Sequence, residues 1–332
     1  MKFITRGYNT ISLDSGRGTL IKTSANSKLK DEIAYFKDIN NMEDPYLQLL
    51  FPRLVDYETS SEPYKLEMEF YPFKNLGNCI TAVENLGEPF WDTVLDRLFG
   101  VIERMKLTTK QLSKTQISEY CRLMFIEKTL REYQSLKNNF PFFASLIKYN
   151  TLEINDVKYE SFEKIWDRIL DKINTIISEE DKFNVIHGDL CFSNILLGEN
   201  SEIDAKTLRL VDPRGSFGAK GVYGSSLYDL AKLSHSINGN YEFFIYDHFE
   251  VETIQPNKFS LKICSGVNKE ICQKLFLERL ADKPEHLQKI KLIEGLIFIG
   301  MCARHYDSFN RQQAMYLTGI KILNEVVNEN LC

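Results

Sequence analysis

The sequence lacks the patterns that define several large classes of protein. Its seven cysteines are odd in number and scattered, with no CxxC pair and no histidine cluster beside them, which favours reduced thiols over a disulfide framework or a zinc site. The most apolar later stretch, residues 292–301, is too short to span a membrane and contains Glu294. The first ten residues lose their apolar character after the fourth, so they lack a signal-peptide core. We therefore expect a cytoplasmic protein.

Dense basic tracts and internal repeats are also absent. The net charge of −5 is a poor electrostatic match for nucleic acid, so we expect neither nucleic acid nor a membrane as a partner. The hydrophobic fraction of 43% and the charged fraction of 26% are those of an ordinary globular protein. A chain of 332 residues can form one large domain or two modest ones. The oligomeric state stays open.

The first seventy residues show β character. Short runs at Lys2–Thr5, Thr10–Asp14 and Thr19–Lys22 are separated by glycines, which suits strands joined by tight turns. The segment from Lys28 to about Asn40 has apolar residues on one helical face. Residues Tyr64–Phe70 alternate apolar and charged side chains, as a half-buried strand does. This part of the chain therefore predicts a small sheet with one helix.

After Pro72 the pattern becomes helical. Apolar residues recur at helical spacing in four stretches, which are 91–102, 165–177, 286–300 and 311–328. One β-rich island, Asn184–Asp212, lies among them. We therefore predict an α+β fold of two lobes. Its parts are an antiparallel sheet with one helix over residues 1–72, a hinge near 69–74, and a mainly helical lobe over residues 73–332.

The β-rich island contains the residues that indicate chemistry. A short apolar strand ends in His187-Gly188-Asp189, Asn194 follows five residues later, and a second apolar strand delivers Asp212. Each piece alone is also compatible with an ordinary turn. In this order, however, they match the loop of a kinase, in which one aspartate orients the attacking hydroxyl while an asparagine and a later aspartate hold Mg²⁺ against the phosphates.

The segment from 184 to 232 resembles a known family. HGDLCFSN resembles the HGDxxxxN catalytic loop of aminoglycoside phosphotransferases and choline kinases. VDPRGSFG and YDLAKL resemble their metal-binding aspartate segment and the helix that begins after it. The resemblance implies a protein-kinase-like bilobal fold and an enzyme that uses ATP or GTP with Mg²⁺ on a small-molecule hydroxyl acceptor.

The resemblance also implies a role for each matching residue. Asp189 would be the catalytic base, and His187 would orient its loop. Asn194 and Asp212 would be the magnesium ligands. Asp229 would brace the catalytic loop from its helix.

The first lobe supplies candidates for nucleotide binding. Lys22 ends an apolar strand, as the phosphate-pairing lysine of a kinase does, although most strand-end lysines are simply solvated. Glu32, on the next helix, is the candidate for its ion pair. The expected phosphate loop is Gly7–Thr10, in which the polar side chains of Asn9 and Thr10 supplement backbone N–H groups.

Two further segments of the first lobe bear on nucleotide binding, one as a candidate and one that we exclude. Glu69, Phe70 and Tyr71 fall where an adenine-binding hinge belongs, and we expect their backbone groups to bind the base. Gly16 and Gly18 lie too close to Lys22 to cover phosphates, so we interpret them as a hairpin turn.

Departures from the protein-kinase pattern point to a small-molecule kinase. There is no GxGxxG, Gly188 replaces the arginine that receives a phosphorylated activation loop, and no APE-like segment follows Asp212. The main alternative is a nucleotide-binding pseudokinase scaffold without turnover. Aminoglycoside kinases and protein kinases are further alternatives.

The acceptor is less well defined. DPRGSFG and the helix start at 228–231 look most like bacterial phosphotransferases associated with surface-polysaccharide synthesis, which implies a sugar or an amino alcohol. Because the hydroxyl must reach Asp189, we expect its pocket on the helical lobe. The expected walls are residues 241–250 with His305 and Tyr306. Three carboxylates, Glu242, Asp247 and Glu250, could favour a cationic acceptor, although a solvated surface is the usual place for such side chains and the one we expect.

Overall fold

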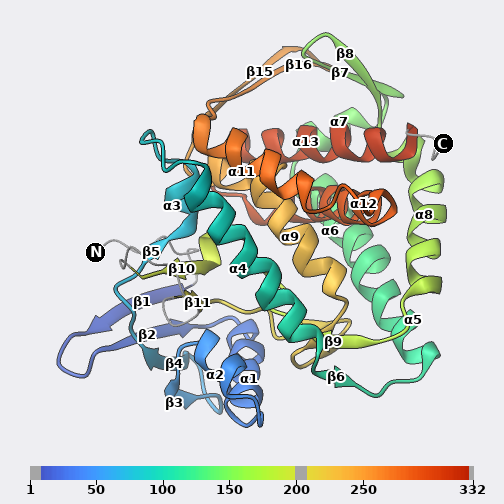
Figure 1. The fold of residues 1–332 in the computed structure, drawn as a ribbon. Helices are drawn as coiled ribbons and strands as arrows, with labels where there is room; N and C mark the ends of the chain where they lie inside the picture. The colour runs from blue at the N-terminus through green and yellow to red at the C-terminus, as the bar shows by residue number, and fades with distance from the viewer. Residues whose placement is uncertain (1–8, 199–207, 329–332) are drawn as a thin grey trace.

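A small antiparallel sheet forms the start of the molecule in the computed structural model, which describes residues 9–198 and 208–328 (Figure 1). Its strand order is β1-β2-β4-β3, and all neighbouring strands run antiparallel. The strands are β1 (Asn9–Asp14), β2 (Thr19–Ser24), β3 (Leu54–Glu58) and β4 (Tyr64–Glu69). The turn between β1 and β2 is closed by Asp14, whose Oδ1 accepts the N–H groups of Gly16 and Arg17, and Gly18 follows at a φ of 65°. The predicted hairpin turn is therefore confirmed.

Two helices cover this sheet. Helix α1 (Lys28–Asn40) buries Leu29, Ile33 and Phe36, the face that the sequence pattern indicated. Helix α2 (Pro45–Leu50) begins at Asp44, whose side chain accepts the N–H groups of the first turn. Helix α1 packs on β3 and β4, and α2 packs on α1 and β11, so both lie outside the larger helical region (Figure 1).

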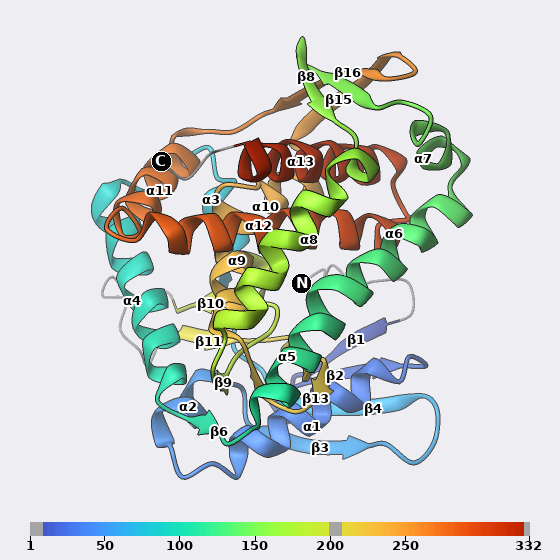
Figure 2. The same ribbon diagram turned by 90° about the vertical axis from the view of Figure 1, so that its right-hand side faces the viewer.

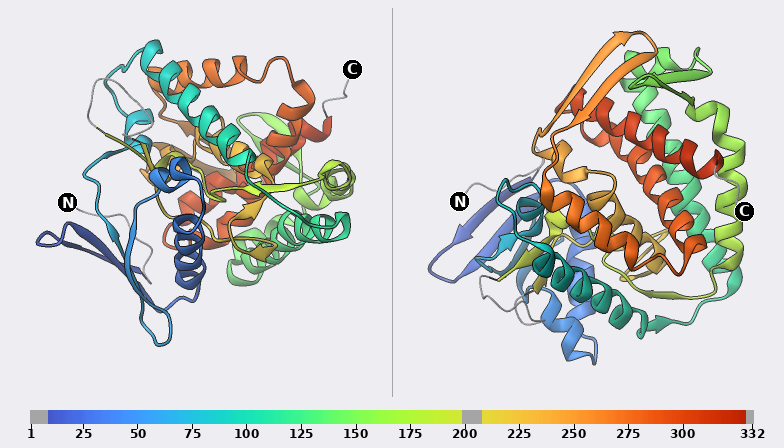
Figure 3. Two further views of the ribbon diagram at one scale, coloured as in Figure 1. Left: turned by 60° about the horizontal axis from the view of Figure 1, so that its bottom comes forward. Right: turned by 45° about the horizontal axis from the view of Figure 1, so that its top comes forward.

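The larger region is helical and is built around one central helix, α9 (Ser226–Ile237). Every residue of α9 from 227 to 237 is buried, with α12, α11 and α4 packed around it (Figure 3). No helix in the described ranges is long and apolar enough to cross a membrane. The other elements of this region are α3 (Leu76–Ile80), α4 (Glu88–Lys106), α5 (Lys114–Arg122), the π-helical η1 (Leu123–Glu127), α6 (Lys128–Asn139), α7 (Pro141–Leu146), α8 (Phe162–Glu179), α10 (Tyr241–Ile245), α11 (Val267–Glu278), α12 (Pro284–Met301), the 3₁₀-helical η3 (Cys302–Arg304) and α13 (Phe309–Asn328).

Short strands between the helices support the catalytic segment. One three-stranded sheet has the order β11-β10-β5 and another has the order β14-β9-β6. They lie between the first sheet and the helices (Figure 1). The strands are β5 (Lys74–Asn75), β6 (Thr109–Lys110), β9 (Phe183–Val185), β10 (Ile195–Leu197), β11 (Leu208–Leu210) and β14 (Tyr223–Gly224), with the 3₁₀ turn η2 (Phe192–Asn194) before β10 and the hairpin β12 (Ser216–Phe217) and β13 (Ala219–Lys220) after β11. The predicted α+β arrangement, a small antiparallel sheet followed by a mainly helical region, is confirmed.

The prediction of a single β-rich island after Pro72 is wrong. A four-stranded sheet, in the order β15-β16-β7-β8, lies beyond α13 at the end of the molecule opposite β1–β4 (Figures 1 and 2). Its strands are β7 (Thr151–Ile154), β8 (Val157–Glu160), β15 (Phe249–Gln255) and β16 (Lys258–Ile263). β7 and β16 pair in parallel although they are far apart in sequence, and most of β15 is exposed. A local apolar pattern therefore gave little sign of them.

Candidate active site

The catalytic segment follows β9 and is held by α9. Asp229 accepts the backbone N–H of His187 at 2.7 Å with one carboxylate oxygen and that of Gly188 at 2.8 Å with the other. Gly188 has a φ of 75°, and a Cβ at this position would lie 2.8 Å from Cβ of Arg214. Glycine is therefore required here for both its backbone conformation and the close approach of Arg214. Asp229 occupies the bracing position that the sequence suggested.

His187 lies behind the loop and does not face solvent. Its ring is fully buried, stacks on Phe51, and places Nε2 3.0 Å from the carbonyl oxygen of Val211, which assigns the proton to Nε2. Nδ1 then accepts the N–H of Asp189 at 3.2 Å. Burial lowers the pKa of His187 to about 4, so the imidazole stays neutral. His187 is thus placed to position the loop rather than to touch a substrate.

Asp189 has a cationic partner that the sequence reasoning missed. Its Oδ1 lies 2.7 Å from Nζ of Lys232, which is buried on α9. Burial acts to raise the pKa of Asp189, but the charge and hydrogen bond of Lys232, together with the charges of Arg214 and His187, outweigh it and hold that pKa well below its usual range. A signal was available, because Lys232 follows Asp229 by three residues on a helix of otherwise apolar and small side chains.

Asn194 and Asp212 are suited to hold a magnesium ion. Nδ2 of Asn194 donates to the backbone oxygen of Asp189 at 2.8 Å, which leaves Oδ1 as the atom that can bind a metal. Asp212 has a φ of 57°, and its side chain is 55% exposed. Magnesium is usually held by one or two oxygen-bearing side chains together with substrate phosphates, so this donor set fits it. Consistently, the described residues contain no cluster of three or more His, Cys, Asp or Glu side chains able to hold a metal by themselves.

Lys22 joins the first sheet to the metal-binding segment. Its Nζ lies 2.6 Å from Oε2 of Glu32 on α1 and 2.5 Å from Oδ1 of Asp212. Burial acts to lower the pKa of Lys22, but the two carboxylates raise it overall. Burial also raises the pKa of Glu32, to about 7. The ion pair between Lys22 and Glu32 is present, and Asp212 is a second partner that the sequence did not suggest.

The remaining candidates for nucleotide binding lie at the edges of the sheet. Asn9 and Thr10 are the first two residues of β1, whereas Gly7 and Tyr8 lie outside the described residues. At the hinge, the N–H of Glu69 donates to the carbonyl of Arg53, and the N–H of Phe70 donates to that of Gly18, both at 3.0 Å. These two amides are therefore already engaged and are not free to bind a base.

Tyr71 connects the hinge to the metal-binding segment. Its hydroxyl donates to Oε2 of Glu69 at 2.8 Å. The guanidinium of Arg209, on β11, lies 4.5 Å from the centroid of its ring. Because Arg209 comes three residues before Asp212, this contact brings the hinge close to the end of β11.

The acidic side chains expected to favour a cationic acceptor do not line an open acidic site. Glu242 is fully buried and accepts the N–H of Ser193 at 3.0 Å and the hydroxyl of Ser236 at 3.1 Å, so it supports the catalytic loop from behind. Asp247 is paired with Arg311. Glu242 is therefore a buried structural carboxylate rather than part of an acceptor wall, whereas Asp247 is a largely exposed, ion-paired surface residue.

Comparison with solved structures identifies the fold. The structure aligns over 98% of this chain and 92% of the other with the GDP and kanamycin complex of APH(2")-IIia, at a TM-score of 0.52 and 14% identity. The chain has the fold of the aminoglycoside phosphotransferases. The GDP complex of wild-type aminoglycoside 2'-phosphotransferase-IIIa gives a TM-score of 0.51 at 15% identity, covering 98% of this chain and 91% of that one.

The kinase-like fold is supported by a sequence match as well. Residues 104–233 match the ecdysteroid kinase-like family, a range that includes the catalytic loop, Asp212 and Asp229 but not Lys22. None of the curated proteins matches the sequence.

Proposed function

We propose that the protein transfers the γ-phosphoryl group of ATP or GTP, with Mg²⁺, to a hydroxyl group of a small molecule. The observation that carries this proposal is the convergence of two structural groups. One is the Lys22–Glu32–Asp212 network, and the other is the catalytic loop with Asp189 and Asn194. The N–H of Val211, next to Asp212, donates to the carbonyl of Asn194 at 3.0 Å and holds the two together.

Each residue then has one task in the transfer. Lys22 would bind the nucleotide phosphates, and Asp212 with Oδ1 of Asn194 would hold magnesium, which neutralises charge on the phosphate oxygens. Asp189 would orient the acceptor hydroxyl and accept its proton while the hydroxyl oxygen bonds to the γ-phosphorus. The bond from that phosphorus to its bridging oxygen breaks, ADP or GDP leaves, and the proton passes from Asp189 to solvent.

A small-molecule acceptor is supported by what surrounds the loop. Gly188 provides no cation to receive a phosphorylated activation loop, and Arg214 covers this glycine instead. The solved relative with kanamycin shows that this fold accepts a small hydroxylated ligand in that protein. We therefore retain a sugar or another small hydroxylated metabolite as the acceptor class.

The proposal is tested by incubating the protein with Mg-ATP or Mg-GTP and a pool of small metabolites. We expect nucleoside diphosphate to be released faster when the pool is present, and a phosphorylated metabolite to appear by mass spectrometry. Nucleotide binding with no product from any pool would instead support the pseudokinase alternative.

A further inference from the structure

Four cationic side chains from different elements gather beside the catalytic loop. They are Lys128 at the start of α6, Arg214 after β11, Lys232 on α9 and Arg304 in η3. They are close enough to affect one another, since the pKa of Lys128 is lowered by burial and then by the charges of Arg214, Arg304 and Lys232. We call these four residues the basic cluster.

Carboxylates match only part of this charge. Lys232 is paired with Asp189, and Arg304 is paired with Glu132 at 2.7 Å. Each of these ion pairs uses one cation and one anion. Lys128 and Arg214 have no ion pair of their own in the described part of the chain. The charge of Glu132 reaches Lys128, and Arg214 helps to lower the pKa of Asp189, but each of these carboxylates is already paired with another member of the cluster.

Lys128 gives the stronger indication that the basic cluster lacks a negatively charged partner. It is only 9% exposed, and neither a hydrogen bond nor an ion pair reaches its Nζ from any residue within 9–198 or 208–328. The side chain of the other cation, Arg214, makes one long hydrogen bond to the described residues, 3.5 Å from Nη1 to the hydroxyl of Tyr228. A buried, unpaired ammonium group is costly, and an anion beside it removes that cost.

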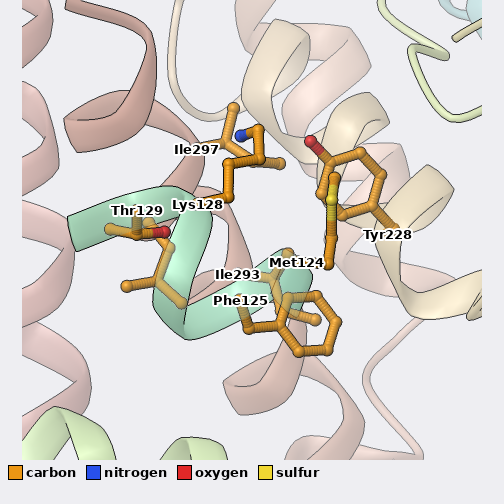
Figure 4. A pocket seen from close by; sticks show the side chains of 8 residues that line it. Met124, Phe125, Lys128, Thr129, Tyr228, Ile293 and Ile297 are labelled. Carbon is orange, nitrogen blue, oxygen red and sulfur yellow. The ribbon is translucent and has the colours of Figure 1, made fainter. Parts of the chain in front are cut away.

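A small cavity lies next to these groups. It has a volume of about 10 Å³, room for roughly one water molecule. Figure 4 shows the amine of Lys128 and the hydroxyl of Tyr228 at the same end of the cavity, with Phe125 and Ile293 at the other. Because Nη1 of Arg214 lies 3.5 Å from the hydroxyl of Tyr228, Arg214 lies near this polar end of the cavity.

The basic cluster is connected directly to the catalytic loop. Arg214 donates its backbone N–H to the carbonyl of His187 at 3.0 Å, and its side chain packs against Gly188. Lys232 holds Asp189 itself. A ligand group bound by Lys128 and Arg214 would therefore lie on the same side of the molecule as the proposed base.

We propose that the basic cluster binds an oxyanion, a phosphate or a carboxylate, carried by the acceptor whose hydroxyl is phosphorylated. This inference rests on the proposed phosphotransferase function and narrows its acceptor class to acidic sugars, sugar phosphates or hydroxy acids. The inference disfavours amino alcohols as acceptors, because their positively charged group would lie close to Lys128 and Arg214 and be repelled by them. Arg214 suits this role, since a guanidinium binds carboxylates and phosphates through two parallel N–H groups.

The first test compares matched acceptors. Glycerol is compared with glycerate and with glycerol 3-phosphate, and glucose with glucuronate and with glucose 1-phosphate. We expect kcat/KM to be about tenfold to a hundredfold higher for the anionic members, as charge-assisted hydrogen bonds would give. Comparing glycerate with glycerol 3-phosphate, and glucuronate with glucose 1-phosphate, shows whether a carboxylate or a phosphate is preferred. Equal use of the neutral members, or a preference for ethanolamine or choline, would overturn the inference.

The second test needs no turnover. The melting temperature is followed while inorganic phosphate is added, with Mg²⁺ and a non-hydrolysable ATP analogue already bound so that the nucleotide site is filled. We expect phosphate to stabilise the wild type and the control Arg131→Met, which changes an exposed cation one turn further along α6. Lys128→Met should lose that response yet melt no lower than the wild type without phosphate, because it removes a buried unpaired charge.

The outcomes separate this inference from the proposed function. If the protein does not bind Mg-nucleotide at all, the proposed function fails. If transfer occurs but phosphate stabilises Lys128→Met as much as Arg131→Met, only the anion site is wrong. A lower melting temperature of Lys128→Met without phosphate would show that Lys128 serves packing instead, and would equally overturn the inference.

Discussion

At the scale of single residues, the proposed base is controlled by a neighbouring lysine. Lys232 keeps the pKa of Asp189 well below its usual range even though burial opposes this. Asp189 must be ionised to accept a proton, so a low pKa keeps it competent as the pH falls. Lys232→Met should raise that pKa and move the acid limb of kcat/KM to higher pH. An acid limb at the same pH in Lys232→Met, Arg131→Met and the wild type would contradict this account.

Some residues of the site can be proposed from the sequence alone, and others cannot. Asp189, Asn194 and Asp212 stand beside strands in a spaced order, and that order is what makes them candidates from the sequence alone. The basic cluster was not predictable in this way, because its members are spread from 128 to 304 and only the fold brings them together. The burial of Glu242 behind the loop was not predictable either, because no local pattern in the sequence shows it.

At the scale of secondary structure, α9 holds the catalytic loop through one carboxylate. Asp229→Asn would leave only one side-chain oxygen to accept the two buried N–H groups of His187 and Gly188. We expect a loss of about 1–3 kcal/mol in the free energy of unfolding, measured with urea, and a lower turnover. Asp171→Asn, a change at an exposed position on α8, is the control and should change the free energy of unfolding little. Equal stability of the two variants would show that Asp229 does not brace the loop.

The elements themselves were predictable where the pattern was local. The predicted helix from Lys28 to Asn40 has the bounds of α1, and α4, α8, α12 and α13 coincide with the four predicted helical stretches. The sheet formed by β7, β8, β15 and β16 was missed because it depends on pairing between distant segments. Asn155 and Leu261, for example, are 106 residues apart and exchange two hydrogen bonds. Such pairing depends on tertiary structure and leaves little trace in short windows.

At the scale of the whole molecule, the first sheet and the helical region meet at Asp212. In this state Asp212 is paired with Lys22, so nucleotide and magnesium must replace that contact. Asp212→Ala should therefore remove the Mg²⁺-dependent part of nucleotide affinity, measured by calorimetry with and without the metal. Asp307→Ala, which changes an exposed carboxylate paired with Arg311 in the distant η3–α13 connection, is the control. Unchanged magnesium dependence in Asp212→Ala would exclude it as a ligand.

The division into lobes at residue 72 stays a prediction, although the order of elements is compatible with it. The sheet of β1–β4 ends at Glu69, and β5 then pairs with β10 in the helical region. The hinge would lie between these two points.

The central claim is tested most directly by following the γ-phosphate itself. Nucleotide labelled at the γ-phosphate is incubated with Mg²⁺ and the full pool of small metabolites, neutral, acidic and cationic, using the wild type and Asp189→Asn. We predict that the wild type transfers the label to a metabolite, and that Asp189→Asn binds nucleotide but transfers it about two to four orders of magnitude more slowly. No labelled metabolite from the wild type, or equal transfer by Asp189→Asn, would contradict the account.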